Sequence, residues 1–257
     1  MTNTVKNGDF VEIEYSGHLK EDNKLFDTTD KEKAQKEGLF DPETQYGAKI
    51  VCIGQTQLLK GLDEQIIGKE IGKEHKFEIG SEQAFGKKSA KLIQMISASK
   101  FKEHKLNPMP GLQINVDGMM GIVKRAGGGR VLVDFNHPLA GHDLVYDLKI
   151  NKIVTDIKEK VKSIMAMNLG QLEFDIEIQG DKALISFTPA NVLPDSILKQ
   201  LELKITEAIP EIKKLENKPG SKEKEKEPGG KSEGATKQPE KQAQKKEETA
   251  QPPEKQV

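Results

Sequence analysis

The sequence contains a single cysteine, Cys52, so the chain cannot form an internal disulfide, which is typical of a protein in a reducing compartment. No apolar run approaches the roughly 20 residues that a membrane-spanning helix needs, and the N-terminus lacks the apolar core of a signal peptide. We therefore expect a cytoplasmic protein with no membrane partner. The net charge is −1, and without a strong positive field we expect no binding to nucleic acid.

Motifs for covalent, metal or nucleotide chemistry are also missing. The chain has no Cys-x-x-Cys pair, no His-x-x-x-His spacing, no dinucleotide-binding glycine fingerprint and no serine in a nucleophile elbow. His137 and His142 are close in sequence, but two histidines without a third ligand are not typical of a metal site. We expect no cofactor and no metal.

The apolar residues are unevenly distributed along the chain. From Asn217 to Val257 there is no leucine, isoleucine, methionine or aromatic residue. Such a segment cannot bury enough apolar surface to offset the entropy of ordering it. The composition predicts a disordered tail over residues 217–257, which either solvates the chain or docks a partner.

Two separated stretches have the character of one β-domain. Val11–Tyr15 and Ile50–Ile53 have the patterns of half-buried and buried strands, and Leu144–Val154 resumes this β character. Gly17 begins a predicted hairpin turn, and Leu58–Gly68 predicts a loop that enters a short helix. The fold class that follows is α+β, with a curved antiparallel sheet around that helix, formed by residues 1–86 and 138–154.

Residues 87–137 interrupt this domain. An unstructured loop of that length is improbable in a compact domain, and loop tips tolerate insertions, so we expect an inserted, mostly-β domain. Short strands are predicted at 111–116, 120–123 and 131–135, with Gly127–Gly129 at a hairpin tip. This glycine run lacks the strand–loop–helix setting of a phosphate loop.

A third unit is predicted over residues 155–216. Asp156 and Glu159 resemble a capping box at the start of an amphipathic helix. Two alternating strands follow, and Asp195 is placed to cap a last helix. This helix–hairpin–helix layer has a sheet edge that could pair with another copy, so a homodimer through this C-terminal domain is possible.

One cluster of aromatic and aliphatic residues with a carboxylate remains as a candidate site. Its members come from different strands and loops: Tyr15, Phe26, Asp27, Leu58, Leu59, Leu62, Phe85 and Tyr146. Taken alone, the pattern is also that of a plain hydrophobic core, and Asp27 after a phenylalanine can simply begin a turn.

The same residues lie in a series of short motifs: Tyr15-Ser-Gly17, Leu25-Phe26-Asp27, Leu58-Leu-Lys-Gly61-Leu62, Gly68-Lys-Glu-Ile-Gly72, Ala84-Phe85-Gly86 and Leu144-Val-Tyr146-Asp147. In order and spacing this series resembles the FKBP-type peptidyl-prolyl cis-trans isomerases. The interruption between Phe85-Gly86 and Asn136-His-Pro-Leu-Ala-Gly141 is similar to the SlyD-like branch, in which an insert-in-flap domain carries chaperone activity. Residues 155–216 look more loosely like the long-chain archaeal FKBPs.

The resemblance implies an isomerase that needs neither a nucleophile nor a cofactor. Phe26, Leu62 and Tyr146 would line the prolyl pocket, and Leu58 and Leu59 would form the adjoining wall. The Leu59 backbone N–H would be available to a substrate carbonyl. The resemblance also implies that Tyr15 and Asp27 are hydrogen-bonded partners that fix the pocket rim.

This sequence departs from the family's pattern at three places. Leu62 stands where many members have tryptophan, and Phe85 replaces the usual tyrosine of the flap, so a hydroxyl donor to the bound peptide is missing. The family often has an aromatic or bulky apolar residue shortly before Gly54, and here Lys49, Ile50 and Val51 are all candidates. These departures bear on macrolide binding more than on isomerase activity.

Methionines in the insert suggest a second binding surface. The candidates for contact with unfolded chains are Met95, Ile96, Met119, Met120 and Ile122. Met accommodates varied shapes, which suits an adaptable apolar surface, but the same residues could form a small core.

The function that follows is a combined peptidyl-prolyl isomerase and folding chaperone, acting on unfolded or nascent polypeptides that contain proline. Two alternatives stay open. One is a holdase chaperone with a vestigial pocket, and the other is a scaffold, monomeric or dimeric, built around residues 155–216.

Overall fold

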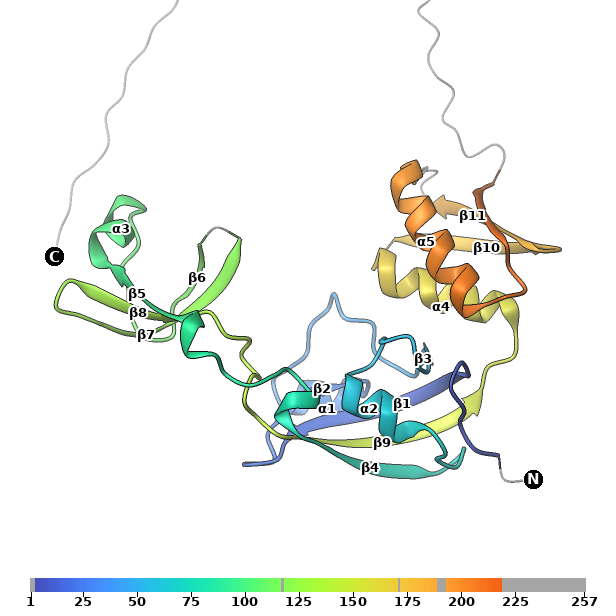
Figure 1. Ribbon diagram of the computed structural model, residues 1–257, viewed down its shortest axis with the longest axis horizontal. Coiled ribbons are helices and arrows are strands. Elements are labelled where there is room, and N and C mark those ends of the chain that lie inside the picture. The colour runs from blue at the N-terminus through green and yellow to red at the C-terminus, as the bar shows by residue number, and fades with distance from the viewer. Residues whose placement is uncertain (1–2, 117, 171, 189–192, 219–257) are drawn as a thin grey trace, which may run out of the picture. The chain divides into compact units, whose positions relative to one another are not determined.

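The computed structural model describes residues 3–116, 118–170, 172–188 and 193–218 (Figure 1). Its strands form three sheets of five, four and three strands, and every pairing in the two larger sheets is antiparallel. The predicted mixed α+β class with antiparallel sheets is therefore confirmed. No described helix has the length and apolarity to cross a membrane. The predicted disordered tail falls almost wholly on residues 219–257, outside the described ranges.

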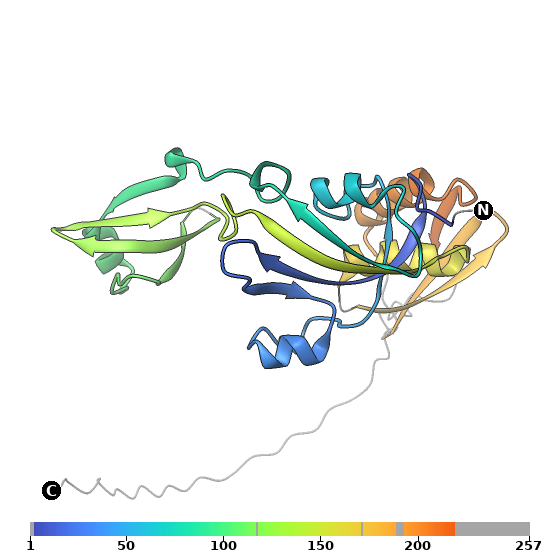
Figure 2. The same cartoon turned by 90° about the horizontal axis from the view of Figure 1, so that it is seen from below.

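The five-stranded sheet contains β1 (Phe10–Leu19), β2 (Leu25–Thr28), β3 (Lys49–Cys52), β4 (Glu74–Ile79) and β9 (Leu144–Ile153). Its order is β2-β1-β9-β4, and β3 pairs with the first residues of β1. Figure 2 shows the yellow-green β9 between the blue β1 and the teal β4. Strands that precede and follow residues 80–143 thus pair with one another, so the chain between them leaves the sheet and returns to it.

Two short helices accompany this sheet, α1 (Lys31–Lys36) and α2 (Lys60–Ile66). Asp30 caps α1, because its carboxylate accepts hydrogen bonds from the backbone N–H groups of Glu32 and Lys33 at 2.9 and 3.1 Å. Leu62 and Ile66 of α2 are buried in the same hydrophobic core as the sheet residues. The α2 helix therefore supplies part of the core that supports the site.

The first hairpin turns later than the sequence predicts. The prediction of a turn beginning at Gly17 is wrong, because β1 continues to Leu19 and the turn follows at residues 20–23. Asn23 takes the left-handed backbone conformation there, with φ 57°, and its N–H donates to the Leu19 carbonyl at 3.0 Å. Gly17 is needed inside the strand, where its missing side chain admits two aromatic rings.

The four-stranded sheet lies within residues 93–134. It consists of β5 (Ile93–Ser97), β6 (Gln113–Val116), β7 (Met119–Gly127) and β8 (Arg130–Asp134) in the order β5-β8-β7-β6, with α3 (Ala98–Glu103) after β5. The 3₁₀ turns η1 (Ser81–Gln83) and η2 (Ala90–Leu92) precede it. Phe101, Val123, Val131 and Val133 are among its buried core. Sequence analysis predicted three of these strands but neither β5 nor α3.

Asn136 fastens together the two segments that lead into and out of this sheet. Its side-chain Oδ1 accepts from the Ser89 N–H at 2.8 Å, and its Nδ2 donates to the Ser89 carbonyl at 3.1 Å. The same Nδ2 donates to buried Asp134 at 2.7 Å. Closer to the five-stranded sheet, the Gly141 N–H donates a hydrogen bond to the Gly86 carbonyl at 2.7 Å. The chain therefore leaves and re-enters that sheet at adjacent points.

The three-stranded sheet is formed by β10 (Glu173–Gln179), β11 (Lys182–Thr188) and β12 (Lys214–Asn217), with α4 (Ile157–Leu169) and α5 (Asp195–Ala208). Its order is β10-β11-β12, and β12 runs parallel to β11. The sequence predicts only a hairpin here, because β12 contains a single apolar residue and has no alternating pattern. Phe10 and Cys52 belong to the same hydrophobic cluster as the core of this unit.

The two helix starts of this unit differ. Asp156 caps α4 and accepts from the Glu159 N–H at 2.8 Å. The predicted cap by Asp195 is wrong, because Pro194 occupies the cap position and no side chain bonds there. Asp195 is instead the first helical residue, where its negative charge favours the positive end of the helix dipole.

Candidate active site

Aromatic side chains from three strands of the five-stranded sheet gather beside α2. The ring of Tyr146 on β9 lies 5.7 Å from that of Tyr15 on β1 and 5.7 Å from that of Phe26 on β2, the latter nearly perpendicular. Seven predicted site residues fall in this one hydrophobic cluster: Tyr15, Phe26, Leu58, Leu59, Leu62, Phe85 and Tyr146. Leu62 and Tyr146 are buried, and the other five are partly exposed. The cluster is therefore open to solvent on one side.

Asp27, the eighth predicted residue, is joined to the cluster by a hydrogen bond. The Tyr15 hydroxyl donates to its Oδ2 at 3.1 Å. Burial, followed by the nearby Asp27 carboxylate, raises the pKa of Tyr15 well above its usual range. Burial and the same carboxylate also raise the pKa of Tyr146. Both phenols therefore stay neutral near neutral pH, and the rim carries a fixed donor–acceptor pair.

Gly17 brings the aromatic rings close to the β1 backbone. A Cβ atom at this position would lie 2.8 Å from the Cζ of Phe26 and 2.9 Å from the Cε1 of Tyr146, closer than real Cβ contacts. The absence of a side chain at Gly17 therefore lets both rings pack directly against the β1 backbone.

Substitution Gly17→Ala should therefore disturb both rings. We expect a loss of about 1–3 kcal/mol in the free energy of unfolding, because the added methyl overpacks the cluster. Urea unfolding measures this loss. Gly80→Ala is the matched control, since Gly80 has φ −64° and its nearest neighbouring atom is 4.0 Å away. Equal effects of the two substitutions would contradict this account of Gly17.

The wall next to α2 is set by the helix start. Leu59 precedes α2, and its carbonyl accepts from the N–H groups of Leu62 and Asp63, each at 2.9 Å. Within the described part of the chain, the Leu59 N–H itself has no acceptor. Buried Asp63, which sequence analysis missed, accepts the Gly54 N–H with both oxygens, at 2.9 and 3.1 Å. It therefore holds the loop between β3 and α2.

His137 is a second residue whose place at the site was missed. Its ring stacks on Phe85 at 4.3 Å with an interplanar angle of 4°, and Phe85 meets Phe26 edge-on at 6.4 Å. The His137 Nδ1 accepts from the Leu139 N–H at 3.2 Å, so this nitrogen is unprotonated in the neutral ring. The sequence motif marked the end of the insertion but gave no sign of this stack.

Comparison with known proteins identifies the family of the chain. Residues 1–102 match the family described as FKBP-type peptidyl-prolyl cis-trans isomerase. Over 153 residues the chain is 31% identical to the short-type peptidyl-prolyl cis-trans isomerase of Methanocaldococcus jannaschii, covering 60% of this chain and 96% of that protein. The chain belongs to the FKBP-type peptidyl-prolyl cis-trans isomerases. The aromatic cluster is therefore part of an isomerase fold rather than of an unrelated β-protein.

Further relatives extend this FKBP assignment. Over 105 residues the chain is 30% identical to the FKBP-type 16 kDa peptidyl-prolyl cis-trans isomerase of Escherichia coli, covering 39% of this chain and 70% of that protein. It is 27% identical over 101 residues to SlyD of Helicobacter pylori, covering 38% of this chain and 55% of that protein. Residues 94–139 match the family described as FKBP26, IF domain. These matches support the SlyD-like resemblance.

In this FKBP-type chain, the predicted insert residues divide between two faces of the four-stranded sheet. Met95 and Met120 are 62% and 58% exposed and, by strand alternation, share the outer face with half-buried Ile122. Met119, 46% exposed, alternates to the other face. Ile96 pairs with Val131 and packs into the core, so it does not belong to the outer face.

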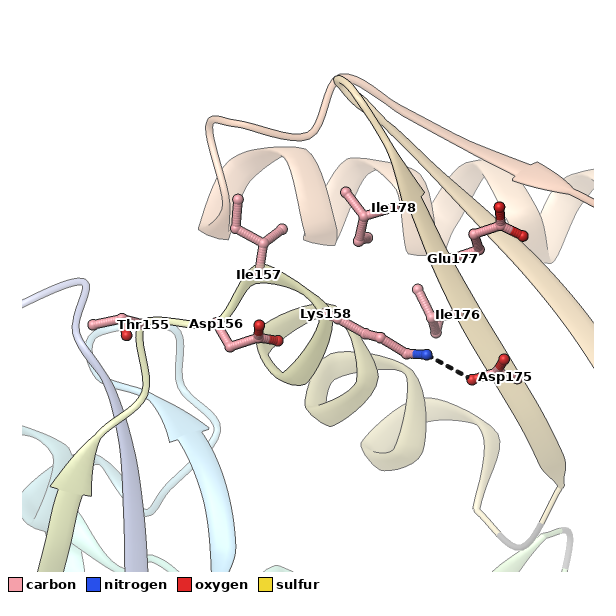
Figure 3. A pocket seen from close by; sticks show the side chains of 8 residues that line it. All are labelled: Thr155, Asp156, Ile157, Lys158, Asp175, Ile176, Glu177 and Ile178. Atoms are coloured by element: carbon pink, nitrogen blue, oxygen red, sulfur yellow. Dashed lines mark ion pairs between the residues drawn. The ribbon is translucent and has the colours of Figure 1, made fainter.

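One groove of the chain lies away from the aromatic cluster. A groove of about 760 Å³ lies between the start of α4 and β10, where Lys158 pairs with Asp175 at 3.0 Å (Figure 3). None of its lining residues belongs to the aromatic cluster. No group of three or more His, Cys, Asp or Glu side chains that could hold a metal occurs among the described residues. Burial raises the pKa of Cys52 to about 11, so this thiol stays protonated at neutral pH.

Proposed function

We propose that this isomerase rotates Xaa-Pro bonds of unfolded or partly folded proteins in the aromatic cluster, and that the four-stranded insert binds those proteins. The observation that carries the first part is the packing of Phe26 and Tyr146 against the bare backbone of Gly17, in one hydrophobic cluster with Leu62. These side chains would line the proline ring, as the family resemblance implies. The partly exposed Phe26 and Leu59 leave the cluster accessible to a peptide.

An apolar pocket is sufficient for this reaction. Resonance makes the peptide C–N bond partly double, and isomerisation of an Xaa-Pro bond takes tens to hundreds of seconds without a catalyst. Twisting the bond disperses the resonance and reduces charge separation between oxygen and nitrogen. A water-poor pocket favours the less polar twisted state over the planar one, which is differential binding of the transition state. The neutral rings of Tyr15 and Tyr146 suit such an environment.

The polar groups of the site would orient the substrate. The Tyr15–Asp27 hydrogen bond fixes the rim next to the Phe26 ring. The Leu59 N–H, which has no acceptor within the described residues, would donate to a substrate carbonyl. Phe85 offers no hydroxyl, so its contribution would be an apolar lid edge held by the His137 stack.

Isomerase assays on Asp27 variants test this assignment. In Asp27→Ala the Tyr15 hydroxyl loses its charged acceptor, and we expect kcat/KM on a short Xaa-Pro peptide and on proline-limited refolding to fall about fivefold to tenfold. Asp27→Asn keeps an acceptor without the charge and should lose less. Asp22→Ala, which removes a carboxylate from the β1–β2 turn, is the control. Unchanged rates in folded Asp27→Ala would remove Asp27 from the site.

The insert's outer face supports the chaperone part of the proposal. Met95 and Met120 project from this face with Ile93, which is 39% exposed, and an unfolded chain could bury these side chains. Flexible methionines adapt to varied partners, as a general chaperone surface requires. The likeness of residues 94–139 to an IF domain and of the chain to a SlyD protein also supports this role.

A holdase with a vestigial pocket is the second candidate. The observations that favour it are Leu62, where many family members have tryptophan, and Phe85, which lacks the tyrosine hydroxyl. A holdase would suppress aggregation of a client without accelerating any proline-limited step. The wild-type peptide assay separates the two functions, because a measurable kcat/KM excludes the holdase alone.

We further propose a division of the chain into an isomerase domain of residues 1–86 and 138–154, an insert of 87–137 and a C-terminal domain of 155–216. The C-terminal domain would also form a homodimer. Among the described residues its β10 edge strand has a neighbour on one side only, and Leu203 and Ile197 of α5 are 69% and 40% exposed. Sedimentation equilibrium at micromolar concentrations should give twice the mass of one chain, and the mass of a single chain would contradict the dimer.

A further inference from the structure

The pairing of β3 with β1 identifies which residue before Gly54 borders the aromatic cluster. In this antiparallel register Val51 pairs with Val11, and Lys49 pairs with Ile13. Side chains alternate along a strand, so Lys49 and Val51 point to the side of the sheet where Val51 joins the isomerase core. Ile50 points to the other side and packs against the C-terminal cluster. Since Val51 is fully buried, only Lys49 can meet a ligand.

Lys49 lies next to the proposed pocket. Its Nζ is 5.7 Å from the ring centroid of Tyr15, in a cation–π contact. The residue is half-buried, and its ammonium group lies over the Tyr15 ring at the edge of the cluster. A cation here replaces the apolar residue that the family often has, which changes the charge of the rim without changing the rings.

The charge of Lys49 is not neutralised by a carboxylate within the described part of the chain. No ion pair to Lys49 is found there, in contrast to Lys60, which pairs with Glu64. At the rim, the Asp27 carboxylate is already engaged by the Tyr15 hydroxyl. An acidic side chain of a bound peptide would therefore find an available cation beside the pocket.

We propose that Lys49 makes this isomerase selective for Xaa-Pro segments with a glutamate or aspartate next to the proline. The inference rests on the proposed function, because it assumes that the proline occupies the aromatic cluster. Lys49 would act on recognition of the flanking residue and not on rotation of the bond. The selectivity is electrostatic, so it should weaken as salt screens the charges.

Two matched peptide pairs test the proposal with the full-length protein. One pair has Glu or Gln immediately before the proline, and the other has Glu or Gln immediately after it. We expect at least one pair to show a kcat/KM ratio of about threefold to fivefold in favour of Glu at about 20 mM salt, decreasing at about 0.5 M salt. In Lys49→Met this ratio should fall to about one. In Lys49→Glu it should fall below one, so that the Gln peptide becomes the better substrate.

Lys60→Met is the matched control, because Lys60 is an exposed lysine at the start of α2 and its side chain is 75% exposed. It should keep the wild-type ratio. Wild-type ratios near one in both pairs, or ratios that survive in both Lys49 variants, would overturn the role of Lys49. If the wild-type protein catalyses isomerisation of none of the four peptides, the proposed function itself is refuted. The two failures can therefore be told apart.

Discussion

Removal of residues 87–137 is expected to reduce catalysis of proline-limited refolding about hundredfold, while kcat/KM on a short Xaa-Pro peptide stays within about twofold. Under the proposed function, a short peptide needs only the aromatic cluster. An unfolded protein gains from being held by a second site on the same chain, because its prolines are then present at a high effective concentration. Refolding kinetics and a peptide assay on the same preparation measure the two effects.

The deletion can be built with little strain on the five-stranded sheet. The Gly141 N–H donates to the Gly86 carbonyl at 2.7 Å, so a short glycine–serine linker can bridge the gap between Gly86 and Pro138. The deletion also removes the contact between His137 and Phe85, so point variants in the intact chain are a necessary control. Equal loss on both substrates would mean that the insert supports the fold of the pocket and not client binding.

Point variants isolate the outer face of the insert. The double substitution Met95→Lys with Met120→Lys places charges on two side chains that are 62% and 58% exposed, so the fold should be retained. We expect it to reproduce most of the refolding loss. Met167→Lys is the matched control, since Met167 on α4 is 44% exposed and lies outside the insert. A refolding rate unchanged by the double variant would place the client elsewhere.

Phe26→Ala should cause the largest loss on short peptides, about tenfold to hundredfold in kcat/KM. Its ring meets Tyr146 and Phe85 edge-on, so truncation opens the wall that would enclose the proline ring. An apolar side chain of this size contributes about 1.5–3 kcal/mol when fully buried, and each 1.4 kcal/mol corresponds to a factor of ten. The partial exposure of Phe26 places the effect below the upper end of that range.

The matched control is Phe40→Ala. Phe40 is 41% exposed and stacks on Tyr46 at 5.6 Å, outside the aromatic cluster. Its removal should leave kcat/KM unchanged. Circular dichroism and urea unfolding of both variants show whether each is folded, and a folded Phe26→Ala enzyme with wild-type activity would exclude Phe26 from the pocket.

The sequence predicts the central strands well because their burial alternates. β1 alternates buried and more exposed side chains over residues 11–14, and β9 does so over residues 146–151, and this period is visible in the sequence. β5 and β12 give no such signal. β5 is an edge strand with mainly exposed side chains, and β12 has one buried residue in four. The partners of these strands, distant in sequence, fix their conformation.

The site residues likewise divide into those that the sequence predicts and those that it does not. Family motifs predicted the Tyr15–Asp27 pair, and the structure brings their side chains within 3.1 Å. The place of Lys49 could not be predicted, because three consecutive residues were candidates and a one-residue shift in register reverses every side chain. The stack of His137 on Phe85 joins residues on the two sides of the insert, so no local pattern could indicate it.

The lack of a side chain at Gly17 has a consequence for how the sequences of such enzymes diverge. Gly17 has no side chain to replace, and any larger residue there collides with Phe26 and Tyr146. Leu62 and Tyr146 are buried, so changes at them act on stability first. New substrate preferences are therefore accessible mainly through the partly exposed positions around the opening, such as Lys49 and Phe85. Selection can change the partly exposed residues at the opening of the cluster while its buried residues stay the same.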